Sequence, residues 1–242
     1  FRDLCKKLNI KNKDKIITLH FREIDYSKSH NKKADKFRTS KIENYYDSIN
    51  FLNSIGFFVV LIGENIKIDY TKIKSKNFCI NYPNSNYRSQ KNDIILINFS
   101  KYFIGCNSGP HWVASSLNKK FCLIDIPFNI GLPYYPNIIY LPLKYYKNNN
   151  LMSLKNIFNE CVNYNFSWLF ESANIKIVGN NSNNILLTIK EFLFSNGEIK
   201  DFKISTDNNL KNFHEEFKKL NKENDYHING KIADVYFETL RN

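Results

Sequence analysis

The sequence predicts an α/β fold, a doubly wound, Rossmann-like parallel sheet followed by a mainly helical carboxyl-terminal extension. Three observations carry this prediction. Between residues 15 and 62 a β-rich apolar run, a helical pattern and a second apolar run follow one another, which is the order of a βαβ unit. The second run, 57–62, is apolar throughout, as expected for a strand covered on both faces of a parallel sheet. A hydrophobic content of 43% in 242 residues allows a substantial core.

The first βαβ unit has recognisable boundaries. Its opening strand is expected at 15–21, and apolar residues recur at helical spacing over 42–55. Ser40 and Glu43 have the spacing of a capping box, which predicts the start of the helix, and Gly56 predicts its end.

The same alternation continues along the chain. A helix capped by Ser89 is expected at 90–99, another begins at Pro110, and further strands are expected at 78–82, 102–105, 121–126 and 138–141. Beyond Lys144 helical patterns dominate, at 154–164, 182–194, 210–220 and 232–240, with a short β-like piece at 174–178. We therefore predict a Rossmann-like domain over residues 1–150, and over residues 151–242 a mainly helical extension that packs on it.

The formal net charge of +12 raises the question of nucleic-acid binding. The lysines are spread through an Asn-, Ile- and Lys-rich chain, and no basic helix or aromatic RNA-binding signature is present. Nucleic acid is therefore not an expected partner. A general affinity for anions remains, either for nucleotides or for an acidic membrane surface.

Cysteine usage and hydropathy indicate the cellular setting. The five cysteines form no CxxC pair, which favours reduced, packed thiols in the cytoplasm and makes a zinc site improbable. No apolar run approaches the roughly 20 residues that span a bilayer, and no signal peptide opens the chain. We expect a cytoplasmic protein, with peripheral association at the inner face of the membrane as an option. Because the chain begins at Phe1, it is also a candidate piece of a longer protein.

The stretch 101–117 holds the first candidate site. A buried strand leads into the polar turn Asn107-Ser108-Gly109, and a helix follows from Pro110. Free N–H groups at such a helix start, together with the helix dipole, can hold a phosphate. An ordinary capping turn would have the same sequence, so other residues must decide between the two.

The carboxyl end of the first strand offers a second group of residues. Strand alternation places His20 and Arg22 on one side of the strand, at the carboxyl end where open parallel sheets bind ligands. An arginine at that position could donate two hydrogen bonds to a diphosphate. The alternatives are a surface ion pair of Arg22 with Glu23 or Asp25, and a hydrogen-bonded structural His20. The polar loop 24–37, which Arg38 closes, is long enough to act as a lid.

Four segments carry a resemblance to a known family. They are HFR at 20–22, FRTSKIENYYDSINFLNSIGFFVVLIGE at 37–64, INYPNSNYRSQKNDIILINFSKYFIGCNSG at 80–109 and GKIADVYFETLRN at 230–242. In order and spacing they resemble a family of bacterial glycosyltransferases from surface-polysaccharide gene clusters, which look like GT-B enzymes. The similarity covers nearly the whole chain but only the carboxyl-terminal, donor-binding half of such enzymes. The HxR strand end is more distantly similar to the GDP-sugar site of fucosyltransferases.

The resemblance implies a nucleotide-sugar-binding domain at 1–150 that transfers a sugar from a nucleotide-diphosphate donor to a surface glycan. Arg22, Arg38 and Asn107-Ser108-Gly109 match the family's strand-end arginine, helix-preceding arginine and phosphate loop. Transfer without a metal or cofactor is expected, because two arginines and a helix dipole can offset the diphosphate charge and no DxD pair is present. No general base is identified, and neither the acceptor nor the oligomeric state follows from the sequence.

Two other functions remain open. The first is a different α/β transferase that acts on activated sugars, and the second is a non-catalytic module that binds nucleotides or polyanions. Protection by nucleotide sugars against heat would separate a glycosyltransferase from the first alternative. Binding that falls steeply with salt, whatever the nucleotide, would identify a polyanion binder.

Overall fold

A computed structural model gives the three-dimensional structure. It describes residues 1–11, 13–23, 39–64, 66–128, 138–161, 164, 167–203, 208–223 and 230–241. Arg38, Asp25 and the whole of the predicted lid, 24–37, lie outside the described residues.

A seven-stranded, entirely parallel sheet forms the centre of the molecule, which confirms the predicted fold class. Its strand order is β10-β6-β5-β4-β1-β2-β3. The first six strands in sequence thus have the Rossmann order 3-2-1-4-5-6, and the chain reverses direction across the sheet between β1 and β4. The strands are β1 (Ile16–His20), β2 (Phe58–Ile62), β3 (Cys79–Asn81), β4 (Tyr102–Gly105), β5 (Phe121–Ile126), β6 (Ile139–Pro142) and β10 (Lys231–Ile232).

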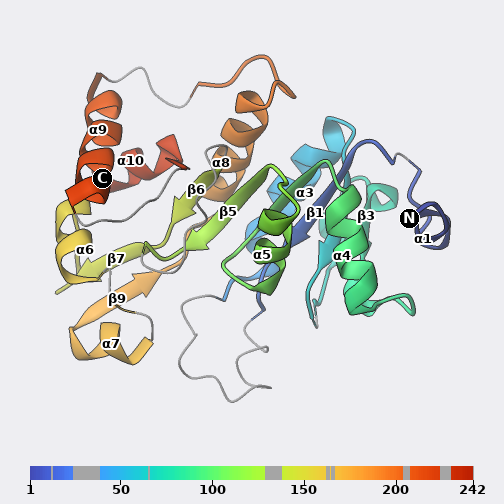
Figure 1. Cartoon of the computed structure of the whole chain (residues 1–242), viewed down its shortest axis with the longest axis horizontal. Helices are drawn as coiled ribbons and strands as arrows, with labels where there is room; N and C mark the ends of the chain where they lie inside the picture. Colours follow the sequence, from blue (N-terminus) through green and yellow to red (C-terminus); the bar gives the residue numbers. More distant parts are fainter. Residues whose placement is uncertain are drawn as a thin grey trace.

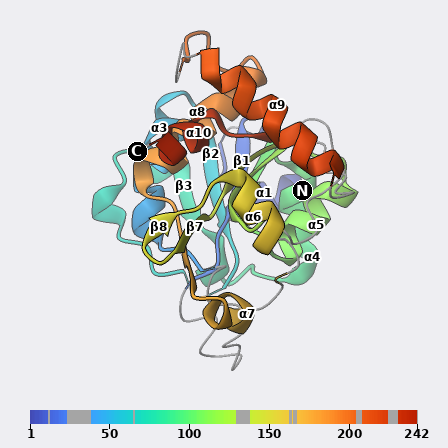
Figure 2. The same cartoon turned by 90° about the vertical axis from the view of Figure 1, so that its left-hand side faces the viewer.

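Helices cover both faces of this sheet (Figures 1 and 2). One layer contains α4 (Gln90–Phe99) and α5 (Gly109–Ser116), and the other contains α3 (Tyr46–Ser54) and α8 (Ser182–Ser195), which pack against each other. The remaining helices are α1 (Arg2–Lys7), α6 (Leu154–Glu160), α7 (Ser167–Ser172), α9 (Asn208–Glu223) and α10 (Asp234–Arg241). Short 3-10 turns occur at Ile42–Tyr45, Tyr70–Lys72, Lys76–Phe78 and Tyr82–Asn84.

The carboxyl-terminal stretch is less helical than the sequence pattern predicts. It contains a small antiparallel sheet of β7 (Lys144–Lys147), β8 (Asn150–Leu151) and β9 (Ile175–Val178). The hairpin β7–β8 turns at Asn148 and Asn149, whose φ angles are 51° and 64°. Asparagine tolerates this left-handed conformation, which two-residue hairpins of the I′ type require.

Polar contacts tie the carboxyl-terminal stretch to the central sheet. Glu191 of α8 is almost fully buried, and it accepts hydrogen bonds from Lys231 Nζ at 2.6 Å and from the Asp234 N–H at 2.8 Å. At the end of β5, Asp125 accepts bonds from both the N–H and the Nδ2 of Asn180, each at 2.8 Å. These buried, charge-assisted bonds hold β10, α8 and α10 against the sheet.

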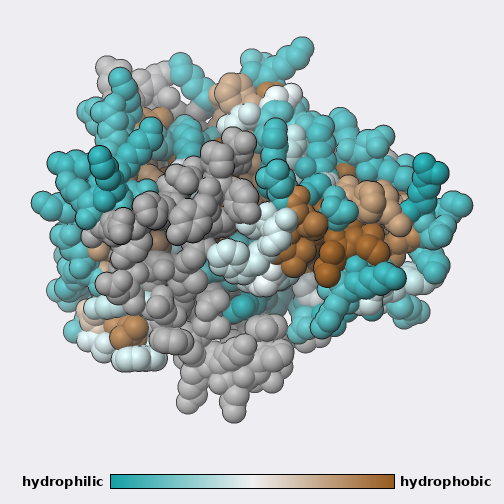
Figure 3. Space-filling model, viewed as in Figure 1, coloured by the Kyte–Doolittle hydropathy of each residue, from teal (hydrophilic) through white to brown (hydrophobic). Residues whose placement is uncertain are grey.

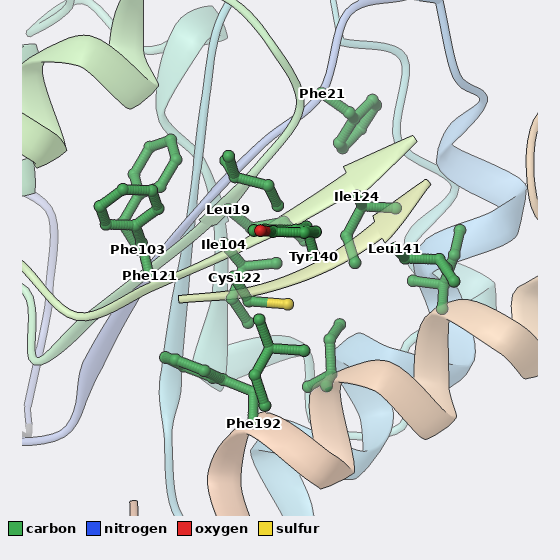
Figure 4. Close-up of a cluster of buried hydrophobic side chains, with 14 of the residues drawn as sticks. Leu19, Phe21, Phe103, Ile104, Phe121, Cys122, Ile124, Tyr140, Leu141 and Phe192 are labelled. Atoms are coloured by element: carbon green, nitrogen blue, oxygen red, sulfur yellow. The ribbon is translucent and has the colours of Figure 1, made fainter. Parts of the chain in front are cut away.

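The core consists of aliphatic and aromatic side chains between the sheet and its helices. Figure 4 shows Phe192 of α8 beneath the strands, close to Cys122 and Ile104. All three side chains are fully buried. The strands that end at the candidate site are therefore held by packing on both faces.

The predicted capping box at Ser40 is wrong. The first helical turn is a 3-10 turn that follows Lys41 without a side-chain cap. The Ser40 N–H instead donates to the carbonyl of Arg22 at 2.8 Å. Ser40 thus fixes the backbone just beyond β1, because a buried N–H takes the acceptor that the tertiary structure brings to it.

In the described residues no helix is both long enough and apolar enough to cross a membrane.

Candidate functional site

A pocket of about 230 Å³ lies at the carboxyl ends of β1 and β2, next to the start of α5. This edge of the sheet adjoins the reversal between β1 and β4, where open α/β sheets bind ligands. The lining residues are His20, Phe21, Arg22, Glu23, Ile62, Gly63, Glu64, Arg88, Asp93, Ser108, Gly109 and Pro110.

The fold brings together four of the six binding residues predicted from the sequence. His20, Arg22, Ser108 and Gly109 all line the pocket. The β1–β4 pairing explains this, because His20 lies beside Gly105 in register and both strands end together. Asn107 is buried and is not among the lining residues, and Arg38 lies outside the described part of the chain.

His20 is a neutral hydrogen-bond acceptor in this pocket. Its Nδ1 lies 2.9 Å from the carbonyl oxygen of Ile62, which can only accept, so Nδ1 carries the proton. Burial, reinforced by the charge of Arg22, lowers the pKa of His20 to about 4. The buried Nε2 therefore keeps a lone pair at neutral pH, and it has no protein partner among the described residues.

The start of α5 is less open to an anion than the sequence predicts. The Ser108 N–H donates to His111 Nδ1 at 3.0 Å, so this donor is already used inside the protein. His111 occupies the third helical position, from which a side chain reaches back to the residue that caps the helix. The prediction that all N–H groups of the turn are free is therefore wrong at Ser108.

The first residue of α5 offers a backbone donor to the pocket. Gly109 begins α5, and within the described residues its N–H has no protein acceptor; Pro110 follows it and has no N–H. A Cβ at Gly109 would have no neighbouring atom within 4 Å, so there is open space in front of this position. The positive end of the α5 dipole adds to the attraction of Arg22 for an anion.

An acidic residue that sequence reasoning missed faces the same pocket. Asp93 lies in the first turn of α4, and its buried Oδ1 has no partner in the described structure. Burial raises the pKa of Asp93 to about 6, although Arg88 opposes the shift. The only sequence signal was an acid in the first turn of a helix, which usually indicates nothing more than compensation of the helix dipole.

Glu64 lies on the same side of the pocket as Asp93 and forms an ion pair with Arg88. Arg88 Nη2 donates to Glu64 Oε1 at 2.9 Å, and the two side chains are 39% and 38% exposed. An exposed pair of this kind contributes little to stability, about 0–1 kcal/mol. Its geometric effect is that the Arg88 guanidinium is directed at the Glu64 carboxylate on this side of the pocket.

Gly63 connects β2 to this side of the pocket. Its φ of +137° is unfavourable for any other residue, and a Cβ there would lie 3.1 Å from Nδ1 of His20. The backbone can approach the imidazole this closely only because the residue is glycine, and Gly63 therefore helps to position His20 over the carbonyl of Ile62.

The pocket thus has two chemically different sides. Arg22 and the start of α5 attract anions, whereas Asp93, Glu64 and the lone pair of His20 accept hydrogen bonds from donors. A ligand that carries both a phosphate group and N–H or O–H donors matches both sides.

The cysteines of the chain are buried thiols. Burial raises the pKa of the Cys106 thiol, which precedes the turn, to about 11, so it is not a reactive thiolate. All five cysteines are free and buried. In the described ranges no cluster of three or more His, Cys, Asp or Glu could hold a metal ion.

Comparisons of the chain with protein-family models, with curated proteins and with solved structures found no match. The function is therefore argued from the chemistry of the pocket.

Proposed function

We propose that the pocket binds the nucleotide-diphosphate part of an activated sugar, and that the chain is the donor-binding domain of a glycosyltransferase acting on a surface glycan. The observation that carries the proposal is the meeting of Arg22 and the α5 start with the acceptor groups of Asp93 and His20 in one pocket. Its position at the carboxyl ends of the strands of a Rossmann-ordered sheet supports the same reading. The resemblance of the sequence to bacterial glycosyltransferases adds the reaction class.

In such a transfer the bond between the anomeric carbon and the diphosphate oxygen breaks, and the acceptor oxygen forms the new bond to that carbon. Negative charge collects on the departing diphosphate. The always-charged, two-pronged guanidinium of Arg22 and the N–H of Gly109 would stabilise this charge, because both are held ready before the reaction. This role requires no metal, and we expect donor binding to persist in the presence of EDTA.

The side of the pocket that accepts hydrogen bonds favours one nucleotide base over another. A carboxylate accepts two N–H donors that lie side by side, and guanine presents such a pair at N1 and N2, whereas uracil presents a single N–H between two carbonyls. Since Asp93 Oδ1 is unsatisfied, we expect a guanine nucleotide to bind more tightly than a uracil nucleotide.

Thermal protection tests the proposal. GDP-sugars and UDP-sugars, each with EDTA, are added to the chain, and the melting temperature is compared with that in sugar phosphates alone. We expect protection by nucleotide sugars, stronger with GDP-sugars, and little effect of sugar phosphates.

Three results would contradict the proposal. Protection by sugar phosphates alone would indicate a different transferase of activated sugars. Protection by any polyanion, lost steeply with salt, would indicate a polyanion-binding module. Binding that requires added magnesium or manganese would refute the metal-independent part.

A further inference from the structure

A group of exposed apolar side chains lies on the outer side of α4 and α5. Ile94 and Phe99 of α4 and Trp112 of α5 are 47%, 49% and 48% exposed. Figure 3 shows an apolar area on the side of the molecule that carries these helices, surrounded by hydrophilic residues. We call Ile94, Phe99 and Trp112 the apolar face. Phe99 stacks on Phe1 with ring centroids 4.2 Å apart, so one face of its ring is covered and the remainder is exposed. Large apolar groups gathered on two neighbouring helices indicate an interaction surface.

The exposed charge on the two helices of the apolar face is positive, whereas Asp93, which precedes Ile94, is partly buried at the pocket. The exposed positions of α4 and α5 include Lys91 and no acidic residue. Lys119 and Lys120 follow α5, and Lys119 Nζ donates to the carbonyl of Asn98 at 2.8 Å, which holds its charge beside the end of α4. Lysines next to exposed Trp, Phe and Ile match a surface that is anionic outside and apolar beneath.

The apolar face also adjoins the pocket. Ile94 directly follows Asp93, and Trp112 lies two residues after Pro110, so the helices that carry the face begin at the pocket lining. A surface that covers the apolar face would lie beside the pocket mouth.

We infer that the apolar face docks the protein on an anionic lipid bilayer, with Ile94, Phe99 and Trp112 entering the interface and the lysines facing the headgroups. The inference is independent of the nucleotide, because it rests on exposure and charge alone. It implies that the pocket works next to the membrane surface, within reach of an acceptor held there.

The two tryptophans of the chain allow a matched test. Trp168 of α7 is also exposed and lies in another part of the molecule (Figure 1), so each tryptophan can be observed alone. Trp168→Phe leaves Trp112 as the only indole, and Trp112→Phe leaves Trp168. Vesicles of phosphatidylcholine with about one-third phosphatidylglycerol should shift the emission of Trp112 to shorter wavelength and leave that of Trp168 unchanged.

Co-sedimentation with the same vesicles gives the second readout. The double variant Ile94→Ser, Trp112→Ser should lower the vesicle partition coefficient by about tenfold. The control double variant Trp168→Ser, Phe194→Ser should leave the partition coefficient unchanged. Binding should weaken with added salt and on vesicles of phosphatidylcholine alone. The unfolding midpoint of each variant checks that its fold is intact.

Absence of sedimentation with the anionic vesicles, or equal sedimentation of the two double variants, would overturn the inference. A shift of Trp112 emission that follows protein concentration without vesicles would also overturn it, because a second copy of the chain would then cover the face. Loss of nucleotide binding with vesicle binding retained would contradict the proposed function and leave the membrane inference standing.

Discussion

Replacing Arg22 with Lys tests whether its guanidinium holds the diphosphate. Arg22 is half-buried, and its charge reaches His20 strongly enough to contribute to the lowered pKa of that imidazole, so it acts in a partly desolvated place. Lysine keeps the charge but loses the two-point fork, at a cost of about 1–3 kcal/mol in binding. That range corresponds to an affinity loss of about 5- to 150-fold for GDP, measured by calorimetric titration. The denaturant midpoint should hardly change.

Arg88→Lys is the matched control, because Arg88 lines the same pocket but is already paired with Glu64. We expect it to change GDP affinity by less than about 1 kcal/mol. If Arg22→Lys binds GDP as tightly as the unchanged chain, the diphosphate does not lie on Arg22. A loss of stability without a loss of affinity would instead identify Arg22 as a structural ion-pair residue. Arg38→Lys tests in the same way the second arginine predicted from the sequence.

Three further predictions concern Asp93, Lys231 and Gly63. The pKa of Asp93 is raised from 3.8 to about 6 in the folded state, so the stability that its proton contributes is complete below about pH 4 and is lost as the pH rises through 6. Asp93→Asn should therefore unfold at higher denaturant than the unchanged chain at neutral pH, lose this advantage near pH 4, and bind GDP more weakly. Lys231→Met should destabilise the fold by about 1–3 kcal/mol in denaturant unfolding, because it leaves the buried Glu191 carboxylate without its cation while Lys231 itself is 43% exposed. Gly63→Ala should cost about 1–3 kcal/mol through its φ of +137°, whereas Gly109→Ala, with open space around its Cβ, should leave the unfolding midpoint nearly unchanged.

The predictions for Asp93 and Lys231 each have an outcome that would refute their reasoning. An Asp93→Asn stability difference that does not vary with pH would mean that Asp93 titrates normally. Lys147→Met breaks the exposed pair with Glu160, so an equal loss in Lys147→Met and Lys231→Met would show that burial of Glu191 does not matter.

Six strands of the central sheet could be predicted because they are local, strongly apolar runs. The seventh, β10, is not predicted, because its two residues Lys231 and Ile232 adjoin the helical pattern expected at 232–240. Residues 102–105 and 121–126 are strands in the structure with the predicted bounds, and the helix 90–99 begins after Ser89, whose hydroxyl accepts the N–H of Asn92 at 3.1 Å. Such signals lie within a few residues of one another, so no knowledge of distant contacts is needed.

Failures occurred where a distant partner decided the outcome. Ser40 has the spacing of a helix cap, but the carbonyl of Arg22, brought near by the folding of the sheet, takes its N–H. The hairpin at 144–151 is not predicted although Asn148-Asn149 is a turn signal, because β7 becomes a sheet strand by pairing with β9, which is distant in the sequence.

The candidate site was predictable only in part. The parallel pairing of two strand ends placed His20 and Arg22 beside Ser108 and Gly109, and strand order follows from general rules for α/β sheets. The role of Asp93 depends on its burial and its unsatisfied oxygen, which emerge only when α4 packs beside the end of β2. The engagement of the Ser108 N–H by His111 has the spacing of a capping box, but His takes the third helical position in place of the usual Glu or Gln, so the pattern is not recognised from the sequence.

The most direct test of the central claim is a crystal structure of the chain soaked with GDP and UDP together. We expect a diphosphate between the guanidinium of Arg22 and the N–H of Gly109, with the nucleotide base on the side of Asp93. A nucleotide bound elsewhere on the chain, or a pocket that stays empty at millimolar nucleotide, would contradict it.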